Sequence, residues 1–344
     1  MGTTRDILQF LHYHPQSSRE EIRVGINFED SDATLKRLIS VGVEAGDITV
    51  SGKARATRYS LSAHAHLLMP LNLDTYFAQD IDERQVQTSF NFELIREQLS
   101  KVDLFTKEEL QHLNALQEVF SGHLKEMTTS EYRKEMERLG IDLSWKSSQI
   151  EGNTYSLLET ERLLRESKTA EGKTKEEAVM LLNHKDALRF VLDNPDYLQE
   201  LTISHIEDIH SLLVKELSVD MGLRHRRVGV TGTNYHPLDN EFQIREAMRD
   251  MCDLINTKSN VFEKALLALL LISYIQPFMD GNKRTARITS NALLIANGYC
   301  PLSFRTVDSI DYKKAMLVFY EQNNLSAFKQ IFISQFEFAV SEYF

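Results

Sequence analysis

The chain has 344 residues, which at roughly 150 residues per domain corresponds to two or three domains. Its 50 acidic and 39 basic side chains give a net charge of −11, which argues against a protein that coats nucleic acid along its whole surface but not against one local DNA-binding module. The longest apolar run, Ala265 to Ile275, is shorter than the roughly 20 residues that a membrane-spanning helix needs. It predicts a buried helix, and we expect no membrane partner.

The cysteines and the first residues of the chain indicate the cellular compartment. Cys252 and Cys300 are isolated and form no CxxC pair, as is typical of a protein kept in a reducing cytosol. The first ten residues show no basic stretch followed by an apolar one, so no signal peptide is indicated. We therefore expect a cytoplasmic protein.

The first part of the chain has the pattern of three short helices followed by two strands. Residues 4–14 place apolar side chains at helical spacing and end at Pro15. Ser18, followed three residues later by Glu21, indicates a capped second helix, and a third begins near Asp32. Two alternating stretches, ITV and TRYSLS, then flank the letters SGKARA and predict a hairpin.

This order of elements, over residues 1–62, resembles a winged helix-turn-helix domain. The resemblance implies that the third helix enters a major groove and that the hairpin touches phosphates. The side chains that would bind DNA are Lys36 and Arg37 on the helix, and Lys53, Arg55 and Arg58 on the hairpin. Residues 1–62 carry equal numbers of acidic and basic side chains, so use of the module for dimerisation or for packing within the chain stays open as well.

The rest of the chain is predicted to be mainly helical. Residues 63–142 have repeated apolar spacing without a chemical motif and are interpreted as a helical connector, whereas residues 143–344 form a second helical domain. Residues 226–239 interrupt this pattern. Their Val, Thr and Tyr content and their glycine turn predict a small β-hairpin.

The segment 274–298 carries the clearest chemistry. Pro277 ends an apolar helix, Asp280, Gly281 and Asn282 have turn chemistry, and a new helix follows, whose free N–H groups attract anions. Three cations stand at this N-terminus, where they are unfavourable unless an anion is bound: Lys283, Arg284 and Arg287. The carboxylate of Asp280 beside them would suit Mg²⁺. The residues themselves thus indicate a site for a magnesium nucleotide or a polyphosphate.

The same segment resembles the signature of the Fic family, H-x-F-x-[DE]-G-N-x-R-x-x-R. The matching residues here are Phe278, Asp280, Gly281, Asn282, Arg284 and Arg287. Only the first position departs, because Gln276 stands where the family has histidine.

A second motif strengthens the resemblance. Self-inhibited Fic proteins carry [ST]-x-x-x-E-[GN], and the chain has Ser147, Glu151 and Gly152 upstream of the core, as in the class II arrangement. The inhibitory helix would lie near residues 144–153. The resemblance covers roughly residues 145–300.

The resemblance implies a mainly α fold, with a helical Fic core and a small β-hairpin flap behind an α/β winged-helix domain. It implies transfer of AMP from ATP to a hydroxyl of a target protein. Asp280 would hold Mg²⁺. The phosphates would be bound by Gly281 and Asn282, with Lys283 and Arg284 beside them. Arg287 would hold the γ-phosphate. Glu151 would pair with Arg287 and block ATP. The target segment would dock by β-augmentation on the flap residues Val228, Val230 and Tyr235.

Gln276 leaves three functions open, because a carboxamide does not titrate near neutral pH and cannot act as the general base that histidine provides. The first is a slow or unusually activated AMP transferase that Glu151 restrains. The second is a non-catalytic ATP sensor that regulates the DNA-binding module. The third is removal of AMP from a target with Glu151 as the catalytic group. A homodimer is compatible with all three.

Overall fold

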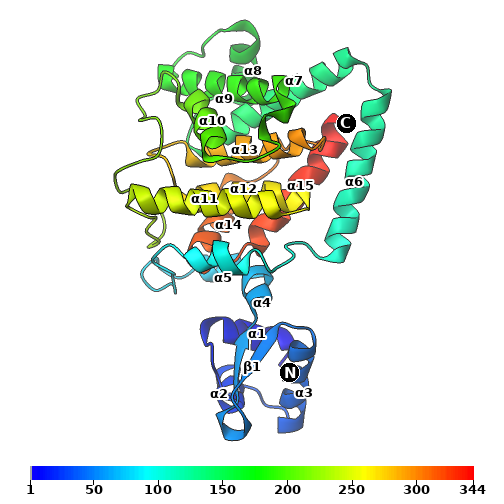
Figure 1. Ribbon diagram of the computed structural model, residues 1–344, viewed down its shortest axis with the longest axis vertical. Coiled ribbons are helices and arrows are strands. Elements are labelled where there is room, and N and C mark those ends of the chain that lie inside the picture. The colour runs from blue at the N-terminus through cyan, green and yellow to red at the C-terminus, as the bar shows by residue number, and fades with distance from the viewer. Residues whose placement is uncertain (1) are drawn as a thin grey trace.

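The computed structural model describes residues 2–344, which form a small N-terminal module and a larger helical body (Figure 1). The module consists of α1 (Thr4–Tyr13), α2 (Arg19–Gly25), α3 (Asp32–Glu44), β1 (Ile48–Ser51), the short turn η1 (Ala54–Ala56) and β2 (Arg58–Leu61). The strands pair antiparallel, with Ile48 opposite Leu61, and Ser18 and Glu21 form the expected capping box. The predicted helices and strands of this region are confirmed, and they enclose a hydrophobic core of their own.

The segment after the module is less helical than its sequence predicts. It contains α4 (Ala63–Leu68), α5 (Leu73–Phe77) and one π-helical turn, η2 (Leu94–Gln98), but residues 78–91 are irregular. The expectation of a continuously helical connector is therefore wrong for residues 78–91. Their backbone groups bond instead to distant segments, for example from the Gln87 N–H to the Glu321 carbonyl at 2.8 Å.

The body is built almost entirely of helices. They are α6 (Lys107–Glu126), α7 (Thr129–Ile150), α8 (Leu157–Glu166), α9 (Lys175–Asp193), η3 (Pro195–Leu198), α10 (Ile203–Val214), α11 (Glu241–Thr257), α12 (Val261–Ile275), α13 (Asn282–Ala296), α14 (Ser309–Gln322) and α15 (Ser326–Tyr343). The mainly α fold class is thus confirmed, and β1 with β2 makes the one sheet found among residues 2–344.

The centre of the body is the pair α12 and α13, which lie side by side (Figure 1). Residues 265–275 of α12 are buried on every side, as expected for a helix that is apolar all round. No helix within residues 2–344 is both long and apolar enough to span a bilayer. The predicted domain boundary at residue 142 stays a prediction. It falls inside α7. Leu99, Phe105 and Leu113, which precede this boundary, belong to the same hydrophobic core as α12.

The predicted hairpin at residues 226–239 is not formed. The two arms exchange no backbone hydrogen bonds, and the segment between α10 and α11 is a loop without strands. Its contacts go to the irregular segment 78–91 instead: the His236 N–H donates to the Thr88 carbonyl at 2.8 Å, and His236 and Ser89 form an isolated parallel bridge. We call residues 228–235 the flap from here on.

Candidate functional site

The site is built around the loop between α12 and α13. Gln276 ends α12 in the left-handed region at φ 51°, and Gly281 directly before α13 has φ 82°. A Cβ at Gly281 would lie 3.3 Å from Val214 Cγ1, so a side chain there would meet both backbone strain and steric pressure. The glycine allows the loop to pass close to α10 before α13 begins.

Side-chain amides fix this loop from within. Asn282 accepts a hydrogen bond from the Phe278 N–H at 2.8 Å and donates from Nδ2 to the Phe278 carbonyl at 2.8 Å and to Gln276 Oε1 at 3.0 Å. The other end of the Gln276 amide donates to the Ser273 carbonyl at 2.6 Å. Gln276 is therefore held at both ends of its carboxamide and serves as part of the loop's scaffold.

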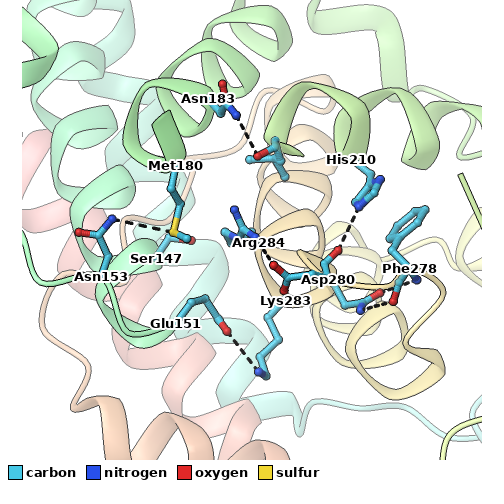
Figure 2. A network of polar contacts seen from close by, with 12 residues as sticks. Ser147, Glu151, Asn153, Met180, Asn183, His210, Phe278, Asp280, Lys283 and Arg284 are labelled. Carbon is cyan, nitrogen blue, oxygen red and sulfur yellow. Dashed lines mark hydrogen bonds and ion pairs between the residues drawn. The ribbon is translucent and has the colours of Figure 1, made fainter. Parts of the chain in front are cut away.

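Two further residues, which the sequence did not single out for the site, support the loop from below. His210 stacks on Phe278 with 3.7 Å between ring centroids, and its Nε2 lies 3.0 Å from the Asp280 carbonyl, to which it donates (Figure 2). Burial lowers the pKa of His210 to about 4, so the ring is neutral at physiological pH. Arg224 donates from Nε to the Gln276 carbonyl at 2.6 Å, and its backbone N–H donates to the Pro277 carbonyl at 3.0 Å. No local spacing connects either residue with the loop.

Glu151 lies against the cations of the motif. It ends α7, and its carboxylate oxygens lie 2.9 Å from Arg287 Nη2 and 3.3 Å from Lys283 Nζ. Figure 2 shows Glu151 and Lys283 joined across the site. Burial alone would raise the pKa of Glu151, but the charges of Arg287 and Lys283 outweigh it and lower that pKa to about 2. Gly152, at φ 100°, follows in a conformation that suits glycine and lets the chain turn away.

Ser147, one turn earlier on α7, completes the hold on Arg287. Arg287 donates from Nε to Ser147 Oγ at 2.8 Å and from Nη2 to the Ser147 carbonyl at 3.0 Å, and its side chain is fully buried. His184 Nε2 lies 2.6 Å from the same hydroxyl. Burial lowers the pKa of His184 well below its usual range, so the neutral ring accepts the proton of Ser147.

The site offers unused donors to an anion. Arg284 Nε and Nη1 and Arg287 Nη1 are buried and have no hydrogen-bond partner within residues 2–344. A buried guanidinium nitrogen without a partner is costly, and a phosphate oxygen would remove that cost. The N-terminus of α13, with Asn282 as its first residue, lines a cavity beside these arginines and adds backbone N–H groups.

Asp280 is the one residue of the loop suited to a divalent cation. Its side chain is 66% exposed, and Oδ2 lies 3.1 Å from Arg284 Nη2. No group of three or more potential metal ligands exists among residues 2–344. A lone accessible carboxylate fits Mg²⁺ that is held mainly by the phosphates of a nucleotide, and it does not fit a cation held by protein alone.

A cavity of about 480 Å³ brings the separate motifs together. It is lined by residues from four parts of the chain: Glu151 and Gly152, the flap residues 228–231, the loop residues 279–283 with Gln276, and α14 with Tyr312, Met316 and Tyr320. Tyr312, which the sequence also left out, lies with its ring 5.4 Å from the Arg287 guanidinium. The cavity is large enough for a nucleotide, and both Lys283 and the flap line it.

The three flap residues chosen from the sequence differ in position. Val228 and Val230 are half-buried and line the cavity. Tyr235 is buried, donates from its hydroxyl to the Tyr274 carbonyl at 2.9 Å and stacks on the Tyr274 ring. The expectation that Tyr235 contacts a target is therefore wrong, because a side chain buried in the core is not accessible; it anchors the flap.

The five basic residues assigned to DNA lie in the N-terminal module, which is separated from α12 and α13 (Figure 1). Lys36 and Arg37 are exposed on α3, and Lys53 and Arg55 are exposed between the strands. Arg58 is half-buried on β2, where it donates to the Thr57 carbonyl. Their role in DNA binding stays a prediction.

The helical body thus holds a loop with three neighbouring cations and an opposing carboxylate, an arrangement that suits a phosphate group. The Fic/DOC family model matches residues 200–294, the part of the chain that holds this loop. This part of the chain is therefore similar to the Fic/DOC family.

Named proteins show the same similarity. Protein adenylyltransferase fic-1 of Caenorhabditis elegans is 27% identical over 176 residues, which is 49% of this chain and 34% of that protein. Protein adenylyltransferase Fic of Nematostella vectensis is 30% identical over 175 residues, which is 49% of this chain and 40% of that protein. The alignments thus cover well under two thirds of either relative.

Solved structures show the same fold. The structure of Fic-1 from Caenorhabditis elegans matches with a TM-score of 0.59 at 21% identity, over 69% of this chain and 71% of that one. A Fic domain containing signaling protein from Bacteroides thetaiotaomicron matches with a TM-score of 0.54 at 19% identity, over 67% of this chain and 96% of that one.

Proposed function

We propose that the protein transfers AMP from ATP to a hydroxyl of a target protein, and that Glu151 restrains this activity. The observation that carries the proposal is the position of Glu151: it lines the cavity, and its two carboxylate oxygens pair with Arg287 and Lys283. A carboxylate and a phosphate compete for the same donors, so ATP has to displace Glu151. The names of the relatives as protein adenylyltransferases support the reaction.

In this function the buried donors receive the phosphates. Arg284 Nε and Nη1, Arg287 Nη1 and the first N–H groups of α13 would bind phosphate oxygens, with Lys283 at the edge of the cavity. Asp280 would hold Mg²⁺ against them, and the cation would supply charge neutralisation on the polyphosphate. Val228 and Val230 would face an extended target segment, and the unpaired backbone of the flap would bond to it.

Gln276 sets the rate that this site can reach. Its Oε1 accepts from Asn282 and retains a second lone pair for the hydroxyl of a target, but it cannot take up the proton. Loss of a general base costs about 10²- to 10⁴-fold in rate. The remaining acceleration would come from positioning and phosphate stabilisation, on which phosphoryl-type transfer depends heavily.

A second candidate function follows from the same residue. Because both ends of the Gln276 amide are engaged in the loop, the site is also suited to bind ATP without turnover and to report its presence to the N-terminal module, which would bind DNA as a winged helix. The third function, removal of AMP with Glu151 as base, is disfavoured, since a carboxylate with a pKa of about 2 is a weak base.

Intact-mass spectrometry separates the two candidates. Glu151→Gly protein with Gln276 unchanged is incubated with Mg-ATP and a cell lysate, beside Glu151→Gly/Gln276→His as a matched comparison and Glu151→Gly/Arg287→Ala as the blank. An AMP adduct on the first protein or on a partner supports transfer. An adduct only with the histidine variant, while the first protein binds Mg-ATP, supports the sensor; no adduct and no binding in either protein refutes both.

A further inference from the structure

The C-terminal end of α14 contacts both sides of the molecule. Tyr320 lines the cavity, whereas the next two residues, Glu321 and Gln322, bond to residues from outside the Fic domain. Glu321 is almost fully buried and accepts a hydrogen bond from the Tyr76 hydroxyl at 2.6 Å. A buried carboxylate in this place, one residue from the cavity wall, has no part in the phosphate chemistry.

Arg84 is the cation that compensates Glu321. Its Nη1 lies 3.3 Å from Glu321 Oε1, and the two side chains are 5% and 0% exposed. The guanidinium also lies over the rings of Tyr76 and Phe77, at 5.8 and 5.1 Å from their centroids. A buried ion pair contributes little net stability but is costly to break, so Arg84 is held firmly in one place.

The same guanidinium holds the flap. Arg84 Nη2 donates to the Gly232 carbonyl at 2.8 Å, at the tip of residues 228–235. Asn234 donates from Nδ2 to Asp82 Oδ1 at 2.9 Å, and the His236 N–H donates to the Thr88 carbonyl. Since the flap arms exchange no backbone hydrogen bonds, these contacts with residues 82–88 set where the flap lies.

The N-terminal module contacts the other side of this cluster. His12 on α1 bonds through Nε2 to Gln322 Oε1 at 3.0 Å and stacks on His66 of α4 at 4.9 Å. Gln322 in turn donates to the Tyr76 hydroxyl at 3.2 Å. Figure 1 shows that the module joins the body on the side of α4 and α5. An unbroken series of buried polar contacts thus runs from the module to the flap.

We propose that Arg84 is a positioning residue for the flap, and that the N-terminal module sets this position through His12, Gln322 and the Arg84–Glu321 pair. Binding of duplex DNA to the module would then change how the flap receives a target segment. The connection between His12 and the flap is argued from contacts alone. The effect of this connection on target docking rests on the proposed function. Regulation would reach the reaction through the protein substrate and would leave the phosphate site unchanged.

Hydrogen exchange of the flap amides that donate hydrogen bonds, those of Tyr235 to Thr233 Oγ1 and of the adjoining His236 to the Thr88 carbonyl, tests the proposal on the full chain without any need for activity. Glu321→Gln and Arg84→Lys weaken the charge-assisted contacts, and we expect the flap amides to exchange about tenfold faster or more. His12→Ala should accelerate the same amides by about 2- to 10-fold. There are two matched controls. Glu263→Gln removes another buried acidic partner, at the start of α12. His14→Ala changes an exposed histidine of the N-terminal module.

The outcomes are separable from those of the proposed function. Faster exchange confined to the flap in all three variants, with Mg-ATP affinity unchanged, supports the positioning role even if no AMP is ever transferred. Flap exchange equal to that of the wild type in Arg84→Lys and His12→Ala overturns it. Exchange that rises equally throughout the body, in the variants and in Glu263→Gln alike, overturns it too, because the pair would then be only structural.

Discussion

Replacement of Glu151 by glutamine removes the negative charge and keeps the shape of the side chain. In the wild type this carboxylate pairs with Arg287 at 2.9 Å and with Lys283 at 3.3 Å. The fall in its pKa from 4.5 to about 2 corresponds to about 3 kcal/mol of favourable interaction in the ionised form. Arg287 keeps its two bonds to Ser147, so we expect the unfolding free energy to fall by about 2 kcal/mol.

The same change should improve ATP binding, because the nucleotide no longer has to displace a carboxylate. If most of the lost interaction opposes phosphate binding in the wild type, Mg-ATP should bind Glu151→Gln at least about tenfold more tightly. Saturating Mg-ATP should then raise the melting temperature of the variant more than that of the wild type.

Calorimetric titration with Mg-ATP and thermal unfolding with and without nucleotide measure both effects. Glu177→Gln is a suitable control, because hydrogen bonds from Thr154 and Thr174 lower the pKa of Glu177 to about 2 as well, yet Glu177 lies outside the cavity. This control should lose stability without gaining affinity. Equal Mg-ATP affinity of the wild type and Glu151→Gln would refute the reasoning that Glu151 and phosphate compete.

Three further changes probe the scaffold of the site. Gly281→Ala should lower the unfolding free energy by about 1–2 kcal/mol and weaken Mg-ATP binding, because the position has φ 82° and an added Cβ would lie 3.3 Å from Val214. Unchanged unfolding and titration curves would contradict this prediction. Tyr235→Phe should lower the unfolding free energy by about 1 kcal/mol in urea, since the Tyr274 carbonyl loses its partner while the ring stack remains; a loss beyond about 3 kcal/mol would mean that the stack is lost too. The neutral His210 has a folded pKa of about 4, below its unfolded value of 6.5, so the unfolded chain binds more protons and stability should fall as pH drops from 6.5 to 4. His210→Gln should make this fall in stability shallower by about 1.4 kcal/mol per pH unit at most, and an identical pH profile would show that folding does not lower the pKa of His210.

Local patterns account for the elements that were predicted correctly. Pro277 and the turn residues before Asn282 mark the break between α12 and α13, because proline ends a helix and the next one starts at its own free N–H groups. The capping box of Ser18 and the apolar run of α12 are equally local. Such signals act within one helical turn and need no knowledge of the tertiary fold.

The errors arose where distant partners decide the structure. Residues 226–239 have the composition of a hairpin, but their hydrogen bonds go to Arg84, Asp82 and Thr88, more than a hundred positions away. His210 and Arg224 support the loop between α12 and α13 from α10 and from the segment that leads to the flap. Nothing in the spacing of these residues connects them with Gln276, so only the packed structure identifies them.

Restraint and nucleotide binding form one equilibrium in the proposed function. Three cations of the motif, Lys283, Arg284 and Arg287, form ion pairs with the carboxylates of Asp280 and Glu151. Departure of Glu151 raises the local charge by one unit at the place where the phosphates would enter. Coupling between two binding events is reciprocal. Any contact that stabilises Glu151 in its position at the end of α7 must therefore weaken ATP binding, and bound ATP must destabilise that position to the same degree. In the proposed function, the C-terminus of α7 is therefore the element through which a partner could control the nucleotide site, whereas the Arg84–Glu321 pair would control the flap.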